Sequence, residues 1–168
     1  MHKRVVAVVL AALAAVAIVA TPVLRATAQS PFGDADAEPV PFGPHMGALM
    51  SMIVQPRHAK LGLAGKAQNW ELAAYSLKEL RQGFAVVAKA VPRWEGQPVP
   101  DLFDSALSQP ITLIDFAIKL RFQKQFDEAY ESLTKGCNAC HATTGHAFVV
   151  IKVPEVSSFP NQEFQLKP

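Results

Sequence analysis

Apolar and polar positions alternate most regularly between residues 70 and 91. Asn69, directly before this stretch, can cap a helix, and Pro92 directly after it cannot continue one. A seven-residue apolar repeat predicts a helix that packs against other helices along one seam. The seam consists of Trp70, Ala73, Leu77, Leu80, Phe84, Val87 and Val91.

An earlier helix is predicted to begin near Pro44, because the fixed backbone angle of proline suits a first turn. Apolar residues then recur at a three-four spacing to about residue 64. Pro56 should kink or interrupt this helix, since proline has no backbone N–H. Gly62 and Gly65 are expected to mark its end.

The second half of the chain predicts a loop over residues 92–100 and two more helices. Asp101 is the expected cap of the third helix, and Pro110 should break that helix into two pieces. A tight turn near residues 119–122 then leads into a fourth helix. We therefore expect an all-α fold. The apolar face of the fourth helix carries Phe122, Phe126, Ala129, Leu133, Cys137 and Cys140.

Both ends of the 168-residue chain differ from this helical part. Residues 1–28 combine a positive start, a long apolar run and a small-x-small ending, which predicts a signal peptide cleaved after Ala28; an uncleaved membrane anchor is the alternative. Residues 29–43 should form a flexible lead-in. Residues 146–168 change to β-branched and proline-rich sequence, which predicts an extended tail over the helices or, alternatively, a disordered one.

Export changes the charge of the protein. The predicted signal peptide contains three of the sixteen basic residues and none of the fourteen acidic ones, so the formal charge falls from +2 to −1. A chain this close to neutral gives no reason to expect nucleic-acid binding. We expect a protein of the bacterial periplasm without stable membrane insertion once the signal is removed.

The chemically most specific stretch is Cys-Asn-Ala-Cys-His at residues 137–141. This C-x-x-C-H pattern attaches a c-type haem: both sulfurs form thioethers with the porphyrin, and the histidine binds iron. Thiols at positions i and i+3 of a helix lie on one face and can reach one porphyrin edge. The two cysteines are the only ones in the chain. The sequence therefore predicts one covalent haem c.

Two other uses of these residues remain open. A thioredoxin-like disulfide would need a strand before Cys137, whereas the preceding segment has a helical pattern. A zinc site would combine Cys137, Cys140, His141 and His146, but no second C-x-x-C is present.

Four amphipathic helices with a single C-x-x-C-H late in the last one resemble the class II cytochromes of the cytochrome c′ type. The resemblance implies an antiparallel up-down-up-down four-helix bundle over residues 44–145, with haem at one end and His141 as proximal ligand. Two features depart from that family. A tail of 27 residues follows His141, and the stretch 55–61 with Asn69 and Trp70 is unlike an ordinary c′ helix pair.

The residue facing His141 decides the chemistry of the iron. In an antiparallel arrangement the haem motif lies level with residues 46–53, and Met50 is our first choice as sixth ligand. Met46 and Ile53 share its inward stripe and should line the haem pocket. The alternatives are Met46, His45 or His58 as ligand, and an open apolar pocket.

These features predict a monohaem c-type cytochrome that exchanges single electrons with a redox protein partner and is not an enzyme. The alternative is c′-type binding of nitric oxide or carbon monoxide at a vacant distal site. Peroxidase-like chemistry would need a distal acid-base residue such as His58 and ranks last. The family resemblance also suggests a homodimer.

Overall fold

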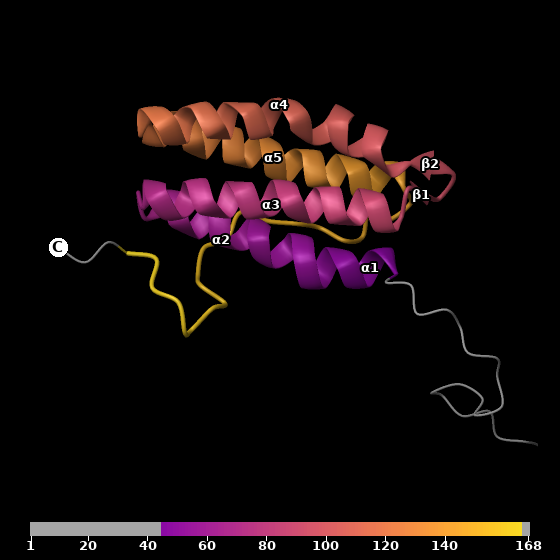
Figure 1. Ribbon diagram of the computed structural model, residues 1–168, viewed down its shortest axis with the longest axis horizontal. Coiled ribbons are helices and arrows are strands. Elements are labelled where there is room, and N and C mark those ends of the chain that lie inside the picture. The colour runs from indigo at the N-terminus through magenta and orange to yellow at the C-terminus, as the bar shows by residue number, and fades with distance from the viewer. Residues whose placement is uncertain (1–44, 166–168) are drawn as a thin grey trace, which may run out of the picture. The chain divides into compact units, whose positions relative to one another are not determined.

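The helix α3 (Trp70–Ala90) forms over the stretch that the apolar repeat predicts (Figure 1). The side chain of Asn69 accepts a hydrogen bond from the backbone N–H of Leu72 at 3.2 Å, which satisfies one free donor of the first turn. The apolar seam is buried, apart from Val91, which lies just beyond the helix and is partly exposed. The predicted cap at Asn69 and the predicted buried face of this helix are therefore both confirmed.

The computed structural model describes residues 45–165. The predicted signal peptide (1–28), the lead-in (29–43) and the last three residues lie outside the described residues. Within the described part, the first helical stretch contains α1 (Met46–Leu49), a π-helical segment η1 (Met50–Val54) and α2 (Gln55–Lys66).

Pro56 does not interrupt this first stretch. It occupies the second position of α2, directly after η1. Proline cannot donate the helical hydrogen bond, and its ring crowds the carbonyl four residues earlier. The wider π-helical turn before Pro56 accommodates both effects, so the chain stays helical through the proline.

The helix ends at Lys66, one residue after Gly65, so the end predicted from Gly62 and Gly65 is confirmed. A Cβ added at Gly62 would lie 2.5 Å from the ring of Tyr130, and one added at Gly65 would lie 2.0 Å from the ring of Phe126. The two glycines therefore let aromatic rings of α5 (Gln123–Thr143) pack directly on the backbone of α2.

The segment after α3 contains more regular structure than predicted. Residues 92–100 include a short antiparallel pair, β1 (Arg93–Trp94) and β2 (Gln97–Pro98), and the next helix, α4 (Val99–Leu120), already begins at Val99. Asp101 lies in its first turn and is not its cap. Pro100 suits the first turn, where its missing N–H needs no partner.

Pro110 does not break α4, contrary to the sequence-based expectation. It is buried in the middle of one continuous helix. Proline at this position removes the helical donor to the carbonyl of Ala106. That carbonyl faces Gly136 of α5: a Cβ added there would lie 2.4 Å from the oxygen. Tertiary packing thus keeps the helix continuous despite the proline.

Replacing Gly136 with alanine should reduce the free energy of unfolding by about 1–3 kcal/mol, because the new methyl group would overlap backbone that cannot rotate away. Chemical denaturation of both proteins measures this difference. Ala139→Gly, at an exposed position of the same helix, is the matched control and should cost only about 1 kcal/mol of helix propensity. A Gly136→Ala protein as stable as the parent would contradict the close approach of α4 and α5.

The tight turn predicted near residues 119–122 is confirmed. Arg121 adopts a left-handed conformation with φ of 52°, and the N–H of Phe122 donates to the carbonyl of Ala117 at 2.9 Å. Phe122 itself is 51% exposed, so its expected place on the buried face of α5 is wrong. It precedes the helix in an extended conformation and therefore does not follow the helical face.

The described helices pack in a closed order: α2 contacts α3 and α5, α3 contacts α4, and α4 contacts α5 (Figure 1). The expected all-α class is confirmed. No helix among residues 45–165 is long and apolar enough to cross a membrane. The core between the helices includes Leu61, Leu80, Ile114 and Leu133, each 0% exposed.

The tail after α5 contains no helix or strand as far as residue 165 and returns along the helices (Figure 1). Phe164 is buried, and its carbonyl accepts a hydrogen bond from the side chain of Asn69 at 3.2 Å. Phe159 packs against Phe164 and lies beneath the ammonium group of Lys60. These contacts agree with the predicted extended segment over the helical core.

Candidate functional site

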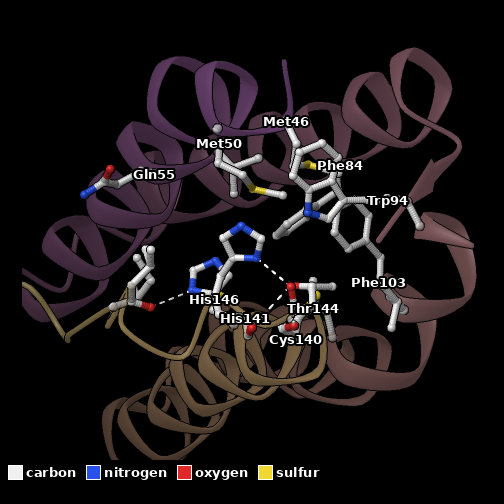
Figure 2. A pocket seen from close by; sticks show the side chains of 18 of the residues that line it. Met46, Met50, Gln55, Phe84, Trp94, Phe103, Cys140, His141, Thr144 and His146 are labelled. Atoms are coloured by element: carbon white, nitrogen blue, oxygen red, sulfur yellow. Dashed lines mark hydrogen bonds between the residues drawn. The ribbon is translucent and has the colours of Figure 1, made fainter. Parts of the chain in front are cut away.

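A cavity of about 310 Å³ lies between the first helical stretch, α4 and the C-terminal part of α5 (Figure 2). Small-molecule and cofactor sites typically measure roughly 300–1,000 Å³ and are mostly apolar. No Asp, Glu, Lys or Arg lines the cavity in the described part of the chain. Its apolar walls include Val54, Phe84, Trp94, Val99, Leu102, Phe103, Leu107, Val149 and Ile151.

The cavity brings together five of the six site residues predicted from the sequence. Cys137, Cys140 and His141 line it from α5, and Met46 and Met50 line it from α1 and η1. In Figure 2 the two methionines lie on the side of the cavity opposite His141.

Ile53, the sixth predicted residue, does not line the cavity. It points toward α3, where a Cβ added at Gly83 would lie 3.1 Å from its side chain. Val54 takes its place, because a π-helical segment has more residues per turn than an α-helix and carries position i+4 onto the same face. The resulting stripe has a four-residue spacing and contains Met46, Met50, Val54 and His58.

Both cysteines are free thiols one helical turn apart. Burial, and secondarily the neighbouring Cys140, raise the pKa of Cys137 to about 12; burial also raises the pKa of Cys140. Reactive cysteines of the thioredoxin type have a lowered pKa instead. The environment of these thiols therefore disfavours thiol-disulfide exchange.

The ring of His141 is held by the tail. Its Nδ1 lies 2.7 Å from the carbonyl oxygen of Val149. A carbonyl can only accept a hydrogen bond, so Nδ1 carries the proton and Nε2 keeps a free lone pair. Histidines that bind metals in proteins are usually fixed in this way by a carbonyl or carboxylate partner. His141 is therefore prepared to bind a metal through Nε2.

The chain reverses direction shortly after the C-x-x-C-H motif. Gly145 has φ of 76°, the N–H of His146 donates to the carbonyl of His141 at 2.7 Å, and the N–H of Gly145 donates to the carbonyl of Ala142 at 3.2 Å. This is a Schellman cap with glycine in its usual left-handed position. The reversal returns residues 146–151 to the cavity.

His146 lines the cavity beside His141, as Figure 2 shows. Its Nδ1 donates to the carbonyl of Thr144 at 2.6 Å, and its ring packs between Trp94 and Phe148. In the sequence His146 is noticeable only as a possible zinc ligand, and Trp94 lies in an expected loop. Gly145 is the local sequence signal for the end of α5 and the reversal of the chain. That reversal brings His146 and the tail to the cavity.

His58, the fourth residue of the stripe, is buried and makes hydrogen bonds through both ring nitrogens. Its Nε2 lies 3.1 Å from Oγ1 of Thr134, and its Nδ1 lies 3.0 Å from the hydroxyl of Tyr130. The hydroxyl of Thr134 donates to the carbonyl of Tyr130, so the neutral ring donates from Nε2–H toward Thr134. The hydroxyl of Tyr130 faces two acceptors of His58, the ring nitrogen Nδ1 and the backbone carbonyl oxygen at 2.8 Å. Burial lowers the pKa of His58 to about 4. His58 thus links α2 to α5 as a neutral residue.

No protein-family model, curated protein or solved structure matches this chain. Within residues 45–165, no group of three or more His, Cys, Asp or Glu side chains could hold a metal ion. Such a group would serve a metal bound by protein atoms alone, whereas a haem iron takes one or two protein ligands.

The donor set nevertheless fits a covalent haem. Two partly buried thiols lie at the i and i+3 positions of one helix, and the histidine that follows has a free Nε2. The thioether of Met50 lies across an apolar cavity from that histidine (Figure 2). Cys137, Cys140 and His141 could hold the haem, and Met50 could bind the iron from the other side.

Proposed function

We propose that this chain is a monohaem c-type cytochrome of the class II, cytochrome c′ type, which transfers single electrons and is not an enzyme. One observation carries the proposal: the C-x-x-C-H residues and Met50, far apart in sequence, line the same cavity. The proposed architecture is an antiparallel four-helix bundle formed by the first helical stretch, α3, α4 and α5.

The haem iron would be oxidised and reduced by one electron, and the chain would provide its ligands and its apolar environment. His141 is the proposed proximal ligand and Met50 the proposed distal one. A thioether ligand raises the reduction potential of a haem iron. The apolar walls exclude water, and the Val149 carbonyl holds His141 in the tautomer that exposes Nε2.

The proposed compartment is the periplasm, after cleavage behind Ala28, because covalent haem attachment takes place outside the cytoplasm. A redox protein is the proposed partner. It would dock where the haem edge is exposed. A homodimer, suggested by the family resemblance, belongs to the same proposal.

Covalent attachment tests the site. Replacing Cys137 and Cys140 together with alanine should abolish haem that stays bound after denaturation, as measured by protein mass and haem absorbance. His141→Ala should change the absorbance spectrum of the iron. His146→Ala, a cavity histidine outside the motif, is the control and should retain the covalent haem. Covalent haem on the protein without cysteines would refute the proposal.

Carbon monoxide distinguishes electron transfer from gas binding. The reduced protein should show a low-spin spectrum that carbon monoxide leaves unchanged, because Met50 occupies the sixth position. Met50→Ala should bind carbon monoxide at once and lower the reduction potential. Met52→Ala is the matched control, since Met52 is 76% exposed and lies outside the cavity.

Immediate carbon monoxide binding by the unmodified protein would replace the electron-transfer proposal with gas binding. The apolar wall opposite His141 makes this the second candidate, because an uncharged diatomic gas needs no polar partner there.

A further inference from the structure

The tail is attached to the haem motif through Asn138, the residue after the first cysteine. The side-chain amide of Asn138 donates to the carbonyl of Ile151 at 2.9 Å, and its Oδ1 accepts from the N–H of Ile151 at 2.8 Å. This pair of bonds imitates the exchange between two β-strands. Asn138 therefore fixes both the position and the direction of the tail at residue 151.

The same tail segment carries the hydrogen-bond partner of His141. The carbonyl of His141 accepts from the N–H of His146 at 2.7 Å, and the carbonyl of His146 accepts from the N–H of Val149 at 2.8 Å. The carbonyl of Val149 then accepts from Nδ1 of His141 at 2.7 Å. The loop closes on the histidine, and its far end is anchored two residues later by Asn138.

We propose that Asn138 is a positioning residue: by anchoring Ile151 it holds the Val149 carbonyl on Nδ1 of His141 and thereby sets the reduction potential of the iron that His141 binds. The inference rests on the proposed function, because the potential exists only if the haem is present. The tail that departs from the cytochrome c′ pattern thus becomes part of the iron site.

The physical reason lies in the basicity of the histidine. A carbonyl partner on Nδ1–H raises the donor strength of Nε2. A stronger donor stabilises the more positive ferric iron over the ferrous iron and so lowers the reduction potential.

Asn138 is well placed to maintain this bond. Val149 and Val150 are exposed, so packing alone holds them weakly. The next anchors of the tail in the structure are Phe159 and Phe164, eight or more residues beyond Ile151. Without Asn138, the segment carrying the Val149 carbonyl can move away from His141.

Asn138→Leu tests the proposal in the full-length haem protein, since leucine has a similar size and cannot make either bond. The reduction potential should rise, with the equilibrium constant for reduction increasing about tenfold, the lower end of effects for residues behind a ligand. For one electron this corresponds to about 59 mV. Asn161→Leu, an exposed tail position, is the matched control and should leave the potential unchanged.

A second measurement does not depend on the iron. Hydrogen exchange of the Ile151 amide should be slow in the parent protein and much faster in Asn138→Leu, because its acceptor is removed. Ile151→Pro removes the same donor while leaving residues 137–141 untouched. It replaces Asn138→Leu as the test of the potential if the latter fails to acquire haem.

The outcomes separate the two proposals. A raised potential together with fast exchange at Ile151 supports the role of Asn138. Fast exchange with an unchanged potential overturns it, because the tail then moves without affecting His141. Slow exchange in Asn138→Leu also overturns it. Absence of covalent haem in the parent protein refutes the proposed function instead and is seen before any variant is made.

Discussion

Lowering the pH from 7 to 4 should cost the folded protein about 3 kcal/mol through His58 alone. Burial lowers the pKa of His58 from the usual 6.5 to about 4. As the pH falls through 6.5, the unfolded chain takes up a proton at His58 while the folded chain does not. The contribution of His58 to stability is therefore fully present above pH 6.5 and is lost between pH 6.5 and about 4.

Denaturant unfolding at pH 7 and pH 4 measures this effect. His58→Gln should be less stable than the parent at pH 7, because it loses part of the hydrogen bonding with Tyr130 and Thr134. Its loss of stability between the two pH values should be smaller than that of the parent by about 3 kcal/mol. His45→Gln, at an exposed position, should behave like the parent.

Equal losses in His58→Gln and the parent would contradict a neutral, buried His58. The prediction also bears on the proposed function, since His58 lines the same cavity as Met50 and the C-x-x-C-H residues. A protonated His58 would place a charge beside the apolar walls. Peroxidase-like chemistry would need His58 as a free acid-base group, and its bonds to Tyr130 and Thr134 disfavour that role.

Gly65→Ala should destabilise the protein by about 3 kcal/mol, the upper end of the usual cost of overpacking. The new Cβ would lie 2.0 Å from the ring of Phe126, which is 1% exposed and enclosed by the core. The ring also stacks on Tyr130, so it cannot move without disturbing the group that holds His58. Chemical denaturation gives the free-energy difference.

Gly47→Ala is the matched control for this substitution. Gly47 is also helical, is exposed, and has nothing within 4 Å of an added Cβ. Alanine there should stabilise the protein by about 0.5–1 kcal/mol through helix propensity. If both substitutions changed stability equally, α2 and α5 would not approach each other as closely as the structure shows.

Sequence patterns predicted the elements whose residues make mainly local interactions. The seam and cap of α3 are set by a repeat and by Asn69, both visible within one helix. The C-x-x-C-H spacing is likewise local. Helix lengths and an antiparallel order predicted that Met46 and Met50 lie beside the C-x-x-C-H motif. The structure brings these residues to one cavity.

The prolines misled the sequence analysis, because their local effects were overridden by packing. Pro110 should break an isolated helix, but a buried ring and the close approach of α5 keep α4 continuous. Gly62 and Gly65 correctly marked the helix end, but their contacts with rings of a helix more than 60 residues away could not be predicted from the sequence.

The sequence by itself determined the all-α class, the core of α3, and the helical spacing of the two cysteines with His141 directly after them. Only the tertiary structure decided which of Ile53 and Val54 lines the cavity, because the π-helical turn changes the face of the helix. It also decided that the tail returns to His141. That return depends on hydrogen bonds between residues eight to thirteen positions apart, which no local periodicity encodes.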